Sequence, residues 1–240
     1  RQADGIIGLT IGRLSALKVL SLRGTPVTDR GVAAFSGLTN VRDLRLDGTR
    51  LTDRGVSEIA GLRGLKRLSL SGTSVTDTGL IALEPCRELE SIELRGTRVT
   101  LGGLYRLFVD LQGRSWAESL AIATGARLDE AGRVLALDLS GLRVRDEDLP
   151  LLRGLEQLQW LKMPRCEASA DALARLPELG LERLSLLDLS GCAIDAAAVE
   201  AIISRMPQLR DLHLENVPIA PSSFDRMRQK YRWLRIYASQ

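Results

Sequence analysis

The sequence predicts an α/β solenoid, in which short units stack so that a curved parallel β-sheet forms the concave face and helices form the convex face. Three observations predict this fold. The stretch LSLRGTPVTDRGV at 20–32 returns as LRLDGTRLTDRGV at 44–56 and as LSLSGTSVTDTGL at 68–80. Within each copy the spacing of apolar residues changes from alternation to helical spacing. Each unit is also too short to bury its own apolar face, so neighbouring units must cover it.

The frame L-x-x-L-x-L, with apolar substitutes, marks the first half of each unit. Its nine copies, the last of them degenerate, begin at Leu17, Val41, Leu65, Leu89, Val134, Leu158, Leu184, Leu209 and Trp233. Neighbouring starts lie 24 to 26 residues apart, except for one gap of 45 residues after Leu89. Alternation such as that of Leu20 and Leu22 with polar neighbours predicts a short strand with one buried face.

The second half of each unit predicts a short helix. In the first copy Val27, Val32 and Phe35 carry the apolar spacing, and the last two fit one face of a helix. Thr28 or Asp29 stands just before this helix and can cap its free N–H groups. Strands of equivalent units then pair in parallel, and the wider helices curve the stack.

The frame L-x-x-L-x-L-x-x-(N/C/T)-x-L resembles a leucine-rich repeat, and GTPVTDRGV at 24–32 resembles the ribonuclease-inhibitor-like subclass common in bacterial repeat proteins. The resemblance covers nearly the whole chain and implies eight to nine repeats with one insert. It also implies recognition of macromolecules, usually proteins, and rarely catalysis. The family's ladder position, whose side chain bonds loop backbone, matches Thr25, Thr49, Thr73, Thr97, Cys166 and Cys192. It departs at Leu142 and Val217, where we expect a weaker ladder.

Five segments are expected along the chain. They are a truncated repeat or N-terminal cap (1–16), repeats 1–4 (17–110), a helix–hairpin insert (111–131), repeats 5–8 (132–221) and a C-terminal cap (222–240). In the insert, SWAESLAIAT predicts a helix with Ser115 as its cap, and a turn at 130–132 separates two strand-like runs. We favour one continuous solenoid over two separately folded arrays, because no Pro/Ser-rich linker is present. The insert either lies at a binding surface or has no function of its own.

At the C-terminus a helix from about Ser223 and a strand around Ile236 are expected. Three aromatic residues of this cap are expected to cover the last exposed core: Tyr231, Trp233 and Tyr237. The same segment carries five basic residues, which we interpret as a solvated outer surface because those of the helix do not share one side.

Composition narrows the class of protein. The 240 residues are 45% hydrophobic and 26% charged, an ordinary globular balance. Net charge is +3, but it is uneven: 17 basic and 12 acidic residues lie in 1–114, 11 and 17 in 115–221, and 5 and 1 in 222–240. This pattern argues against a uniform nucleic-acid-binding face. No apolar run approaches ~18 residues, so no membrane span is expected.

Catalysis and metal binding have little support. The one histidine, His213, has Cys192 in the preceding unit, but that thiol occupies an inward ladder position and is expected to be buried and inert. No cofactor is expected. Asp188, Asp211, His213 and Glu215 lie on adjacent strands and could form a metal site, but no spacing motif supports one, so we interpret them as a solvated acidic surface. Three cysteines give no disulfide framework, which favours a reducing compartment such as the cytoplasm. The chain begins at Arg1, so we expect the native N-terminus to lie outside it.

Alternation along the strands predicts which side chains face the concave side. The partner-binding candidates are Arg23, Arg45, Arg67, Glu93, Arg95, Asp138, Trp160, Lys162, Leu186, Asp188, Asp211, His213 and Glu215. Trp160 and Leu186 occupy the same position in neighbouring units, and since adjacent strands lie ~4.8 Å apart, the two side chains should touch. Such a pair is typical of a binding hot spot, unless the insert or an end loop covers it.

The leading hypothesis is a non-enzymatic scaffold that binds a protein through its concave sheet, centred on Trp160 and Leu186. A second hypothesis is a recruitment arm of a larger enzyme or effector whose catalytic domain lies outside this chain. A third is an anionic-ligand or nucleic-acid binder that uses the arginines of the first half. Asp43, Asp47 and Glu93 interleave with those arginines, so we expect cross-strand ion pairs instead. The oligomeric state does not follow from the sequence.

Overall fold

The computed structural model describes residues 10–239, and the chain divides into two compact units, residues 1–125 and 126–240. Most of the cap or truncated repeat expected at 1–16 therefore lies outside the described residues. Each unit has its own sheet, with four strands in unit 1 and six in unit 2. Among the described residues, no helix has the length and apolar character needed to cross a membrane.

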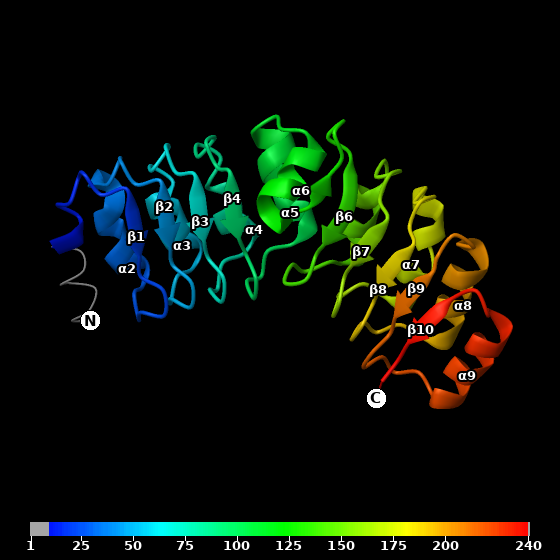
Figure 1. The fold of residues 1–240 in the computed structure, drawn as a ribbon. Helices are drawn as coiled ribbons and strands as arrows, with labels where there is room; N and C mark the ends of the chain where they lie inside the picture. The colour runs from blue at the N-terminus through cyan, green and yellow to red at the C-terminus, as the bar shows by residue number, and fades with distance from the viewer. Residues whose placement is uncertain (1–9, 240) are drawn as a thin grey trace. The chain divides into compact units, whose positions relative to one another are not determined.

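Unit 1 contains four parallel strands in sequence order: β1 (Val19–Ser21), β2 (Asp43–Arg45), β3 (Arg67–Ser69) and β4 (Ser91–Glu93). Leu20, Leu44, Leu68 and Ile92 stand opposite one another across the sheet and point into the core. Helices lie on one side of this sheet (Figure 1). They are α2 (Asp29–Val32), η1 (Ala33–Gly37), α3 (Asp53–Ile59), α4 (Asp77–Ile81), α5 (Leu101–Tyr105) and η2 (Arg106–Leu111).

Unit 2 is built on the same plan. Its strands are β5 (Arg127–Leu128), β6 (Val134–Asp138), β7 (Trp160–Lys162), β8 (Leu186–Asp188), β9 (Asp211–His213) and β10 (Arg235–Tyr237). All neighbours pair in parallel except β5 and β6, which form the antiparallel hairpin expected from the insert. The helical segments are η3 (Asp146–Leu152), α7 (Ala170–Leu173), η4 (Leu176–Leu179), α8 (Ala196–Arg205) and α9 (Pro221–Lys230).

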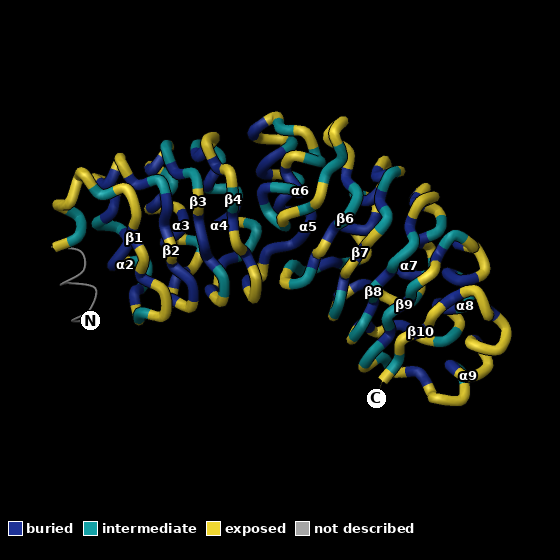
Figure 2. Tube along the Cα trace, viewed as in Figure 1, coloured by how far each residue is buried: buried dark blue, intermediate teal, exposed yellow. Residues whose placement is uncertain are grey.

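The core of each unit is the layer between strands and helices, where Figure 2 shows the buried residues concentrated. Val27, Val32 and Phe35 are completely buried, as their spacing predicts, and so are their counterparts Leu51, Val56 and Ile59. Fully burying a side chain of this size contributes roughly 1.5–3 kcal/mol before entropic costs. The repeated apolar positions therefore hold each stack together.

The Gly-Thr pair of the motif makes the turn after each strand. Gly24 has φ +68° and its counterparts in unit 1 are similar, a backbone region that glycine occupies without strain. The following threonine then donates its hydroxyl to the carbonyl three residues earlier, at 2.6 Å for Thr25 and 2.7 Å for Thr49. In unit 2 Arg165 and Asn216 occupy the same left-handed position at φ +57° and +56°, so this turn does not require glycine there.

The Thr-Asp-x-Gly part of the motif joins neighbouring repeats. Asp53 accepts one hydrogen bond from the Thr76 amide and one from the Thr76 hydroxyl, both at 2.7 Å. The same pair of bonds recurs in three more places. Asp29 accepts both from Thr52, Asp77 from Thr100 and, in unit 2, Asp146 from Ser169. The threonine caps the helix as predicted, because the Thr28 hydroxyl accepts a hydrogen bond from the Arg30 amide at 3.3 Å. The aspartate instead fastens its own repeat to the next one.

The glycine of this motif leaves room for the carboxylate. A Cβ built on Gly79 would lie 2.5 Å from Asp53 Oδ1, and one on Gly103 would lie 2.2 Å from Asp77 Oδ1. Both distances are far inside van der Waals contact. In unit 1 this series of Asp–Thr bonds ends at Thr100, because Leu101 stands where the next aspartate would be.

The insert is divided between the two units. Its helix α6 (Trp116–Thr124), capped by the Ser115 hydroxyl, packs against β4 and α5 at the end of the first sheet. Its strand β5 pairs with β6 at the start of the second sheet. Strand pairing is therefore interrupted between β4 and β5, and the division falls after Gly125, the left-handed C-cap of α6.

Candidate functional site

The face of the unit 1 sheet that points away from the helices carries charged side chains, as alternation predicts. Arg23, Arg45, Arg67, Glu93 and Arg95 are all exposed there or just beyond the strands. Asp43 and Asp47 share this face but are buried, with Asp43 only 3% exposed. The sequence predicted that these carboxylates project outward, and they do, but the longer arginine side chains cover them.

We call the hollow lined by Arg23, Arg45, Arg67, Asp43 and Asp47 the arginine pocket; its volume is about 230 Å³. Asp43 lies between two guanidinium groups, at 3.1 Å from Arg45 Nη2 and 3.0 Å from Arg67 Nε. Arg23 Nε lies 3.3 Å from Asp47 Oδ2. The cross-strand ion pairs expected from the sequence are therefore present for Arg23 and Arg67, whereas Arg45 pairs with Asp43 of its own strand, β2.

Hydrogen bonds from Arg45 lower the pKa of Asp43; burial opposes this shift, and Arg67 adds to it. Ser69 lies deeper in the arginine pocket and contacts Asp47 Oδ1 and, at 3.1 Å, Glu93 Oε2. Because carboxylates already engage the arginines from below, positive charge in this pocket is largely neutralised within the protein. Arginines that are already paired attract an added anion more weakly than three unpaired arginines would.

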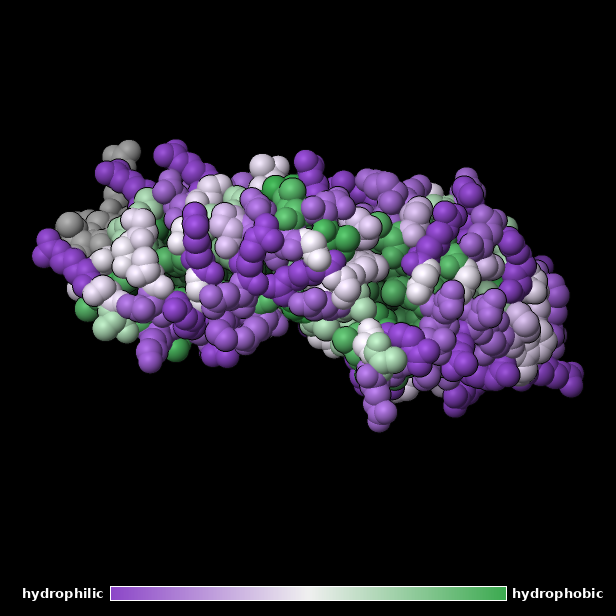
Figure 3. Space-filling view, turned by 90° about the horizontal axis from the view of Figure 1, so that it is seen from above, coloured by the Kyte–Doolittle hydropathy of each residue, from purple (hydrophilic) through white to green (hydrophobic). Residues whose placement is uncertain are grey.

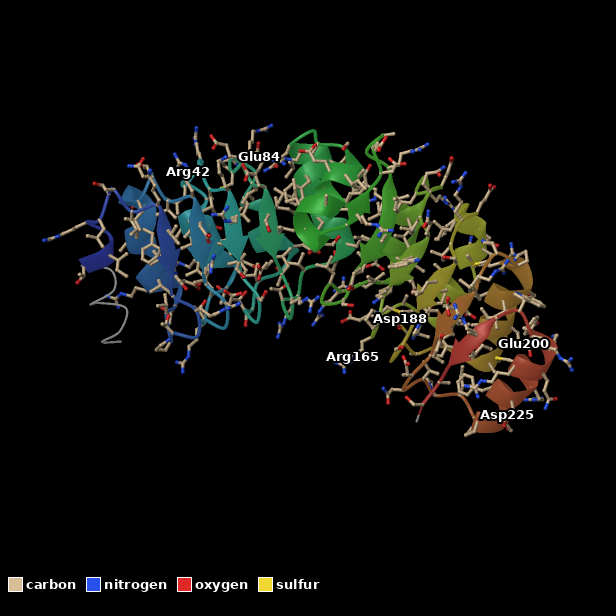
Figure 4. The ribbon with its side chains drawn as sticks, viewed as in Figure 1. Arg42, Glu84, Arg165, Asp188, Glu200 and Asp225 are labelled. Carbon is tan, nitrogen blue, oxygen red and sulfur yellow. The ribbon has the colours of Figure 1, made fainter. Side chains whose placement is uncertain are left out.

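The open face of the unit 2 sheet has two complete rows of side chains. The first row consists of Arg127, Ala136, Trp160, Leu186, Asp211 and Arg235. The second consists of Asp138, Lys162, Asp188, His213 and Tyr237. Figure 4 labels Asp188 on β8, whose carboxylate accepts a hydrogen bond from the Ser190 amide at 2.9 Å.

Trp160 and Leu186 are directly opposed on β7 and β8, which places them side by side as predicted. Trp160 remains 45% exposed, while Leu186 is partly buried. The guanidinium carbon of Arg127 lies 5.3 Å from the centre of the Trp160 ring, within range of a cation–π interaction. We call these three residues the tryptophan patch. The insert therefore contributes a residue to this patch through β5 without covering it.

The last two strands bring together a polar cluster. His213 stacks on Tyr237 with ring centres 4.4 Å apart, and the Tyr237 hydroxyl donates to Asp211 Oδ1 at 3.2 Å. Arg235 donates to Asp211 Oδ2 at 2.7 Å. Glu215 accepts from the Ser190 hydroxyl at 2.5 Å and lies 3.7 Å from His213 Nδ1. Asp211, His213 and Glu215 thus have protein partners of their own.

The expectation for the C-terminal aromatic residues was partly wrong. Tyr231 is buried and covers the core, but Trp233 is 46% exposed and Tyr237 points to the open face of the sheet. Alternation around the inward Ile236 places Arg235 and Tyr237 on that face, so period 2 in the final strand could have identified both. Arg127 was missed because the hairpin was treated as an insert rather than as part of the sheet.

The five basic residues of the C-terminal segment were assigned to a solvated outer surface. That holds for Lys230 of α9, which pairs with Glu200 of α8 at 3.0 Å. Arg228 also turns back, to the carbonyl of Ile236 at 2.9 Å. Arg235 is the exception, because it belongs to the open face of the sheet.

Within residues 10–239, no group of three His, Cys, Asp or Glu residues is arranged to hold a metal ion. Cys192 is 1% exposed, and its sulfur contacts the carbonyl of Met163 at 3.1 Å. On the face shown in Figure 3, hydrophilic side chains cover most of the surface and hydrophobic ones form only small groups.

A family model described as a leucine-rich repeat matches residues 15–36, 37–60 and 63–83. No curated protein sequence matches the chain. Among solved structures, the chain is similar to a leucine-rich repeat protein of Leptospira interrogans, with a TM-score of 0.50 and 20% identity, covering 94% of this chain and 62% of that one.

Two internalins of Listeria monocytogenes are also similar. The internalin inlF gives a TM-score of 0.48 at 18% identity, covering 96% of this chain and 78% of that one. Internalin C2 gives 0.47 at 18% identity, with coverage of 98% and 92%. The fold is a leucine-rich repeat solenoid, with parallel strands on one face and helices on the other. At these identities the likeness to solved structures concerns the fold alone.

Proposed function

We propose that this leucine-rich repeat protein is a non-enzymatic recognition scaffold that binds a protein partner through the open face of its second sheet. The tryptophan patch is the centre of that site. The charged residues of the second row, Asp138, Lys162 and Asp188, form its rim. Repeats of this kind indicate a protein-interaction scaffold, and the exposed tryptophan patch supports this face as its binding site.

The observation that carries the proposal is the exposure of Trp160. Although it contacts Arg127, this indole in the middle of a six-stranded sheet remains 45% exposed and leaves that surface open to a partner. Tryptophan and arginine are enriched at the energetic centres of protein interfaces, where truncating such a residue often costs at least ~2 kcal/mol of binding energy. Both residue types occur here in contact with each other.

Rigidity favours binding at this surface. Trp160 and Leu186 are held on paired strands, so little backbone freedom is lost when a partner docks. Arg127 further limits the movement of the indole. A partner that supplies an apolar side chain for Trp160 and polar groups for the surrounding charges would fit this face.

The arginine pocket supports a protein partner over a nucleic acid. Phosphate binding depends on several unpaired cationic side chains. Three of the four arginines of the unit 1 face contact Asp43 or Asp47. The GTxVTDxG motif in turn supports placing the unit 1 repeats in the ribonuclease-inhibitor-like subclass.

The test compares three proteins: wild type, the double variant Trp160→Ala/Leu186→Ala and the control Trp233→Ala. The control removes an indole of matched exposure, 46%, from the C-terminal turn before β10. All three proteins are immobilised at equal density, and proteins captured from a lysate of the source cells are quantified by mass spectrometry. Any protein lost only with the double variant is then purified and titrated against each immobilised chain.

The expected result is a purified partner whose affinity falls at least ~30-fold with the double variant and less than ~3-fold with Trp233→Ala. Melting temperatures should stay close to wild type, because both altered side chains lie on the surface. If the double variant retains wild-type affinity for every purified partner, the tryptophan patch is not the binding centre.

A further inference from the structure

Two of the three cysteines meet across a repeat boundary in unit 2. Cys166 follows β7 and Cys192 follows β8, each four residues beyond the paired residues Lys162 and Asp188. Their sulfur atoms lie 2.7 Å apart, closer than two non-bonded sulfurs normally approach. Three cysteines spaced far apart in the sequence do not predict a pair. The stacking of the repeats brings these two thiols together.

These thiols do not behave like the threonines of unit 1 at the same ladder position. Thr25, Thr49, Thr73 and Thr97 each bond a carbonyl within their own turn. Cys192 Sγ instead contacts the Met163 carbonyl of the preceding repeat at 3.1 Å and accepts the Cys166 amide at 3.3 Å. The two sulfur atoms are therefore turned toward each other rather than toward their own backbone.

The backbone permits a covalent link. Parallel neighbours lie ~4.8 Å apart, which falls inside the Cα separation of roughly 4.4–6.8 Å that disulfides require. The two sulfurs, 2.7 Å apart, must approach by less than ~1 Å to reach the ~2.05 Å of an S–S bond. We propose that Cys166 and Cys192 are a modification site that closes to a disulfide between adjacent repeats by exchange with a low-molecular-weight disulfide such as oxidised glutathione.

The exchange balances in two steps. The Cys166 thiolate attacks one sulfur of oxidised glutathione, which forms a mixed disulfide and releases one glutathione thiolate. The Cys192 thiolate then attacks the Cys166 sulfur and releases the second glutathione. Two protein thiols are oxidised, one small disulfide is reduced to two thiols, and the two protein protons pass to water or to the released thiolates.

Cys166 is the first nucleophile because of its position. It is 7% exposed, whereas Cys192 is 1% exposed, so local opening of the turn reaches Cys166 first. The Cys192 thiol and two backbone groups stabilise the Cys166 thiolate and lower its pKa, although burial opposes the shift. The pKa of Cys192 is raised by its contact with Cys166 and by burial.

Cys86 provides an internal control. It lies in unit 1, where its thiol contacts the carbonyls of Ala60 at 3.6 Å and Leu62 at 3.8 Å. Burial raises its pKa to about 11, so little thiolate forms at neutral pH. It has no cysteine neighbour within the described residues and is expected to stay reduced while the pair in unit 2 closes.

The experiment uses the full chain and four variants: Cys86→Ser, Cys166→Ser, Cys192→Ser and Cys166→Ser/Cys192→Ser. Each protein is equilibrated with glutathione buffers from fully reduced to fully oxidised. Free thiols are then alkylated in denaturant, and the products are mapped by peptide mass spectrometry. Thermal melting is recorded for the same samples.

In the oxidised buffer, wild type and Cys86→Ser should each yield one linked peptide pair containing Cys166 and Cys192. Their melting temperature should rise by roughly 5–10 °C, because the link closes a loop of about 26 residues in the unfolded chain. Cys192→Ser should accumulate a mixed disulfide at Cys166 faster than Cys166→Ser accumulates one at Cys192. The double variant should show no shift on oxidation.

The proposal is overturned if both thiols of folded wild type remain free in fully oxidised buffer. It is also overturned if the pair stops at mixed disulfides with glutathione, or if the linked peptides contain Cys86. A melting shift of equal size in the double variant would assign the stabilisation to another cause. Thiol mapping does not depend on any binding partner, so these results are independent of the function proposed above.

Discussion

Asp53 offers the sharpest test of what holds neighbouring repeats together. The substitution Asp53→Ala removes both hydrogen bonds to Thr76, the one from its amide and the one from its hydroxyl. A hydrogen bond to a charged group contributes roughly 1.5–3 kcal/mol when buried. Asp53 and Thr76 are only partly buried, so we discount each bond to about 1 kcal/mol and expect a total loss of about 2 kcal/mol.

The assay must report on unit 1 alone, because two units can unfold separately. The three tryptophans make this possible: Trp116 lies in unit 1, whereas Trp160 and Trp233 lie in unit 2. In a background carrying Trp160→Phe and Trp233→Phe, fluorescence from Trp116 follows the unfolding of unit 1 in urea. A loss of about 2 kcal/mol should lower the midpoint by about 0.7–2 M, given a slope of roughly 1–3 kcal/mol per molar.

Thr76→Val isolates the hydroxyl bond, since it leaves the amide in place. A double-mutant cycle with Asp53→Ala should give a coupling energy of about 1 kcal/mol. The control is Glu58→Ala, which removes an exposed acidic residue from the same helix as Asp53, α3, without breaking an inter-repeat hydrogen bond or ion pair among the described residues. A loss of stability below ~0.5 kcal/mol for Asp53→Ala, or a coupling energy near zero, would refute the claim that the Asp53–Thr76 bonds hold neighbouring repeats together.

Two further outcomes are expected. Gly79→Ala should destabilise unit 1 by about 1–3 kcal/mol, because its Cβ would overlap Asp53 Oδ1 at 2.5 Å and Asp53 Cα at 2.8 Å; Gly61→Ala, which would meet no atom within 4 Å, should be nearly neutral by the same urea assay. Asp43 has a lowered pKa in the folded state, so its contribution is complete above the unfolded value of about 3.9 and is lost as pH falls through the folded value. The stability difference between wild type and Asp43→Asn, measured in urea at pH 7, 5 and 3, should therefore be largest at pH 7 and shrink at pH 3; a difference independent of pH would contradict the proposed role of Arg45 and Arg67.

The sequence located the strands well, because alternation of buried and exposed residues is a local property of the chain. Leu20, Leu44 and Leu68 are buried in register as their spacing predicts. The same alternation placed Trp160 and Leu186 side by side. It also gave the helix capped by Ser115 and the hairpin that follows.

Burial on the open face was harder to predict. Alternation gives the direction of a side chain but not what its neighbours cover. Asp43 and Asp47 point outward and yet are buried, because the longer side chains of arginines from the same and adjacent strands lie over them. The contribution of Arg127 depended on which sheet the hairpin joined, which no local pattern determines.

By itself, the sequence determined the repeat, its parallel strands and its buried Leu positions, since these follow from the period of the apolar residues. Only the tertiary structure decided which side chains of successive repeats meet. Asp53 reaches Thr76, and Cys166 faces Cys192, across 23 and 26 residues of chain. Such contacts arise from stacking, because one turn of the solenoid returns the chain to the same place one strand spacing further on.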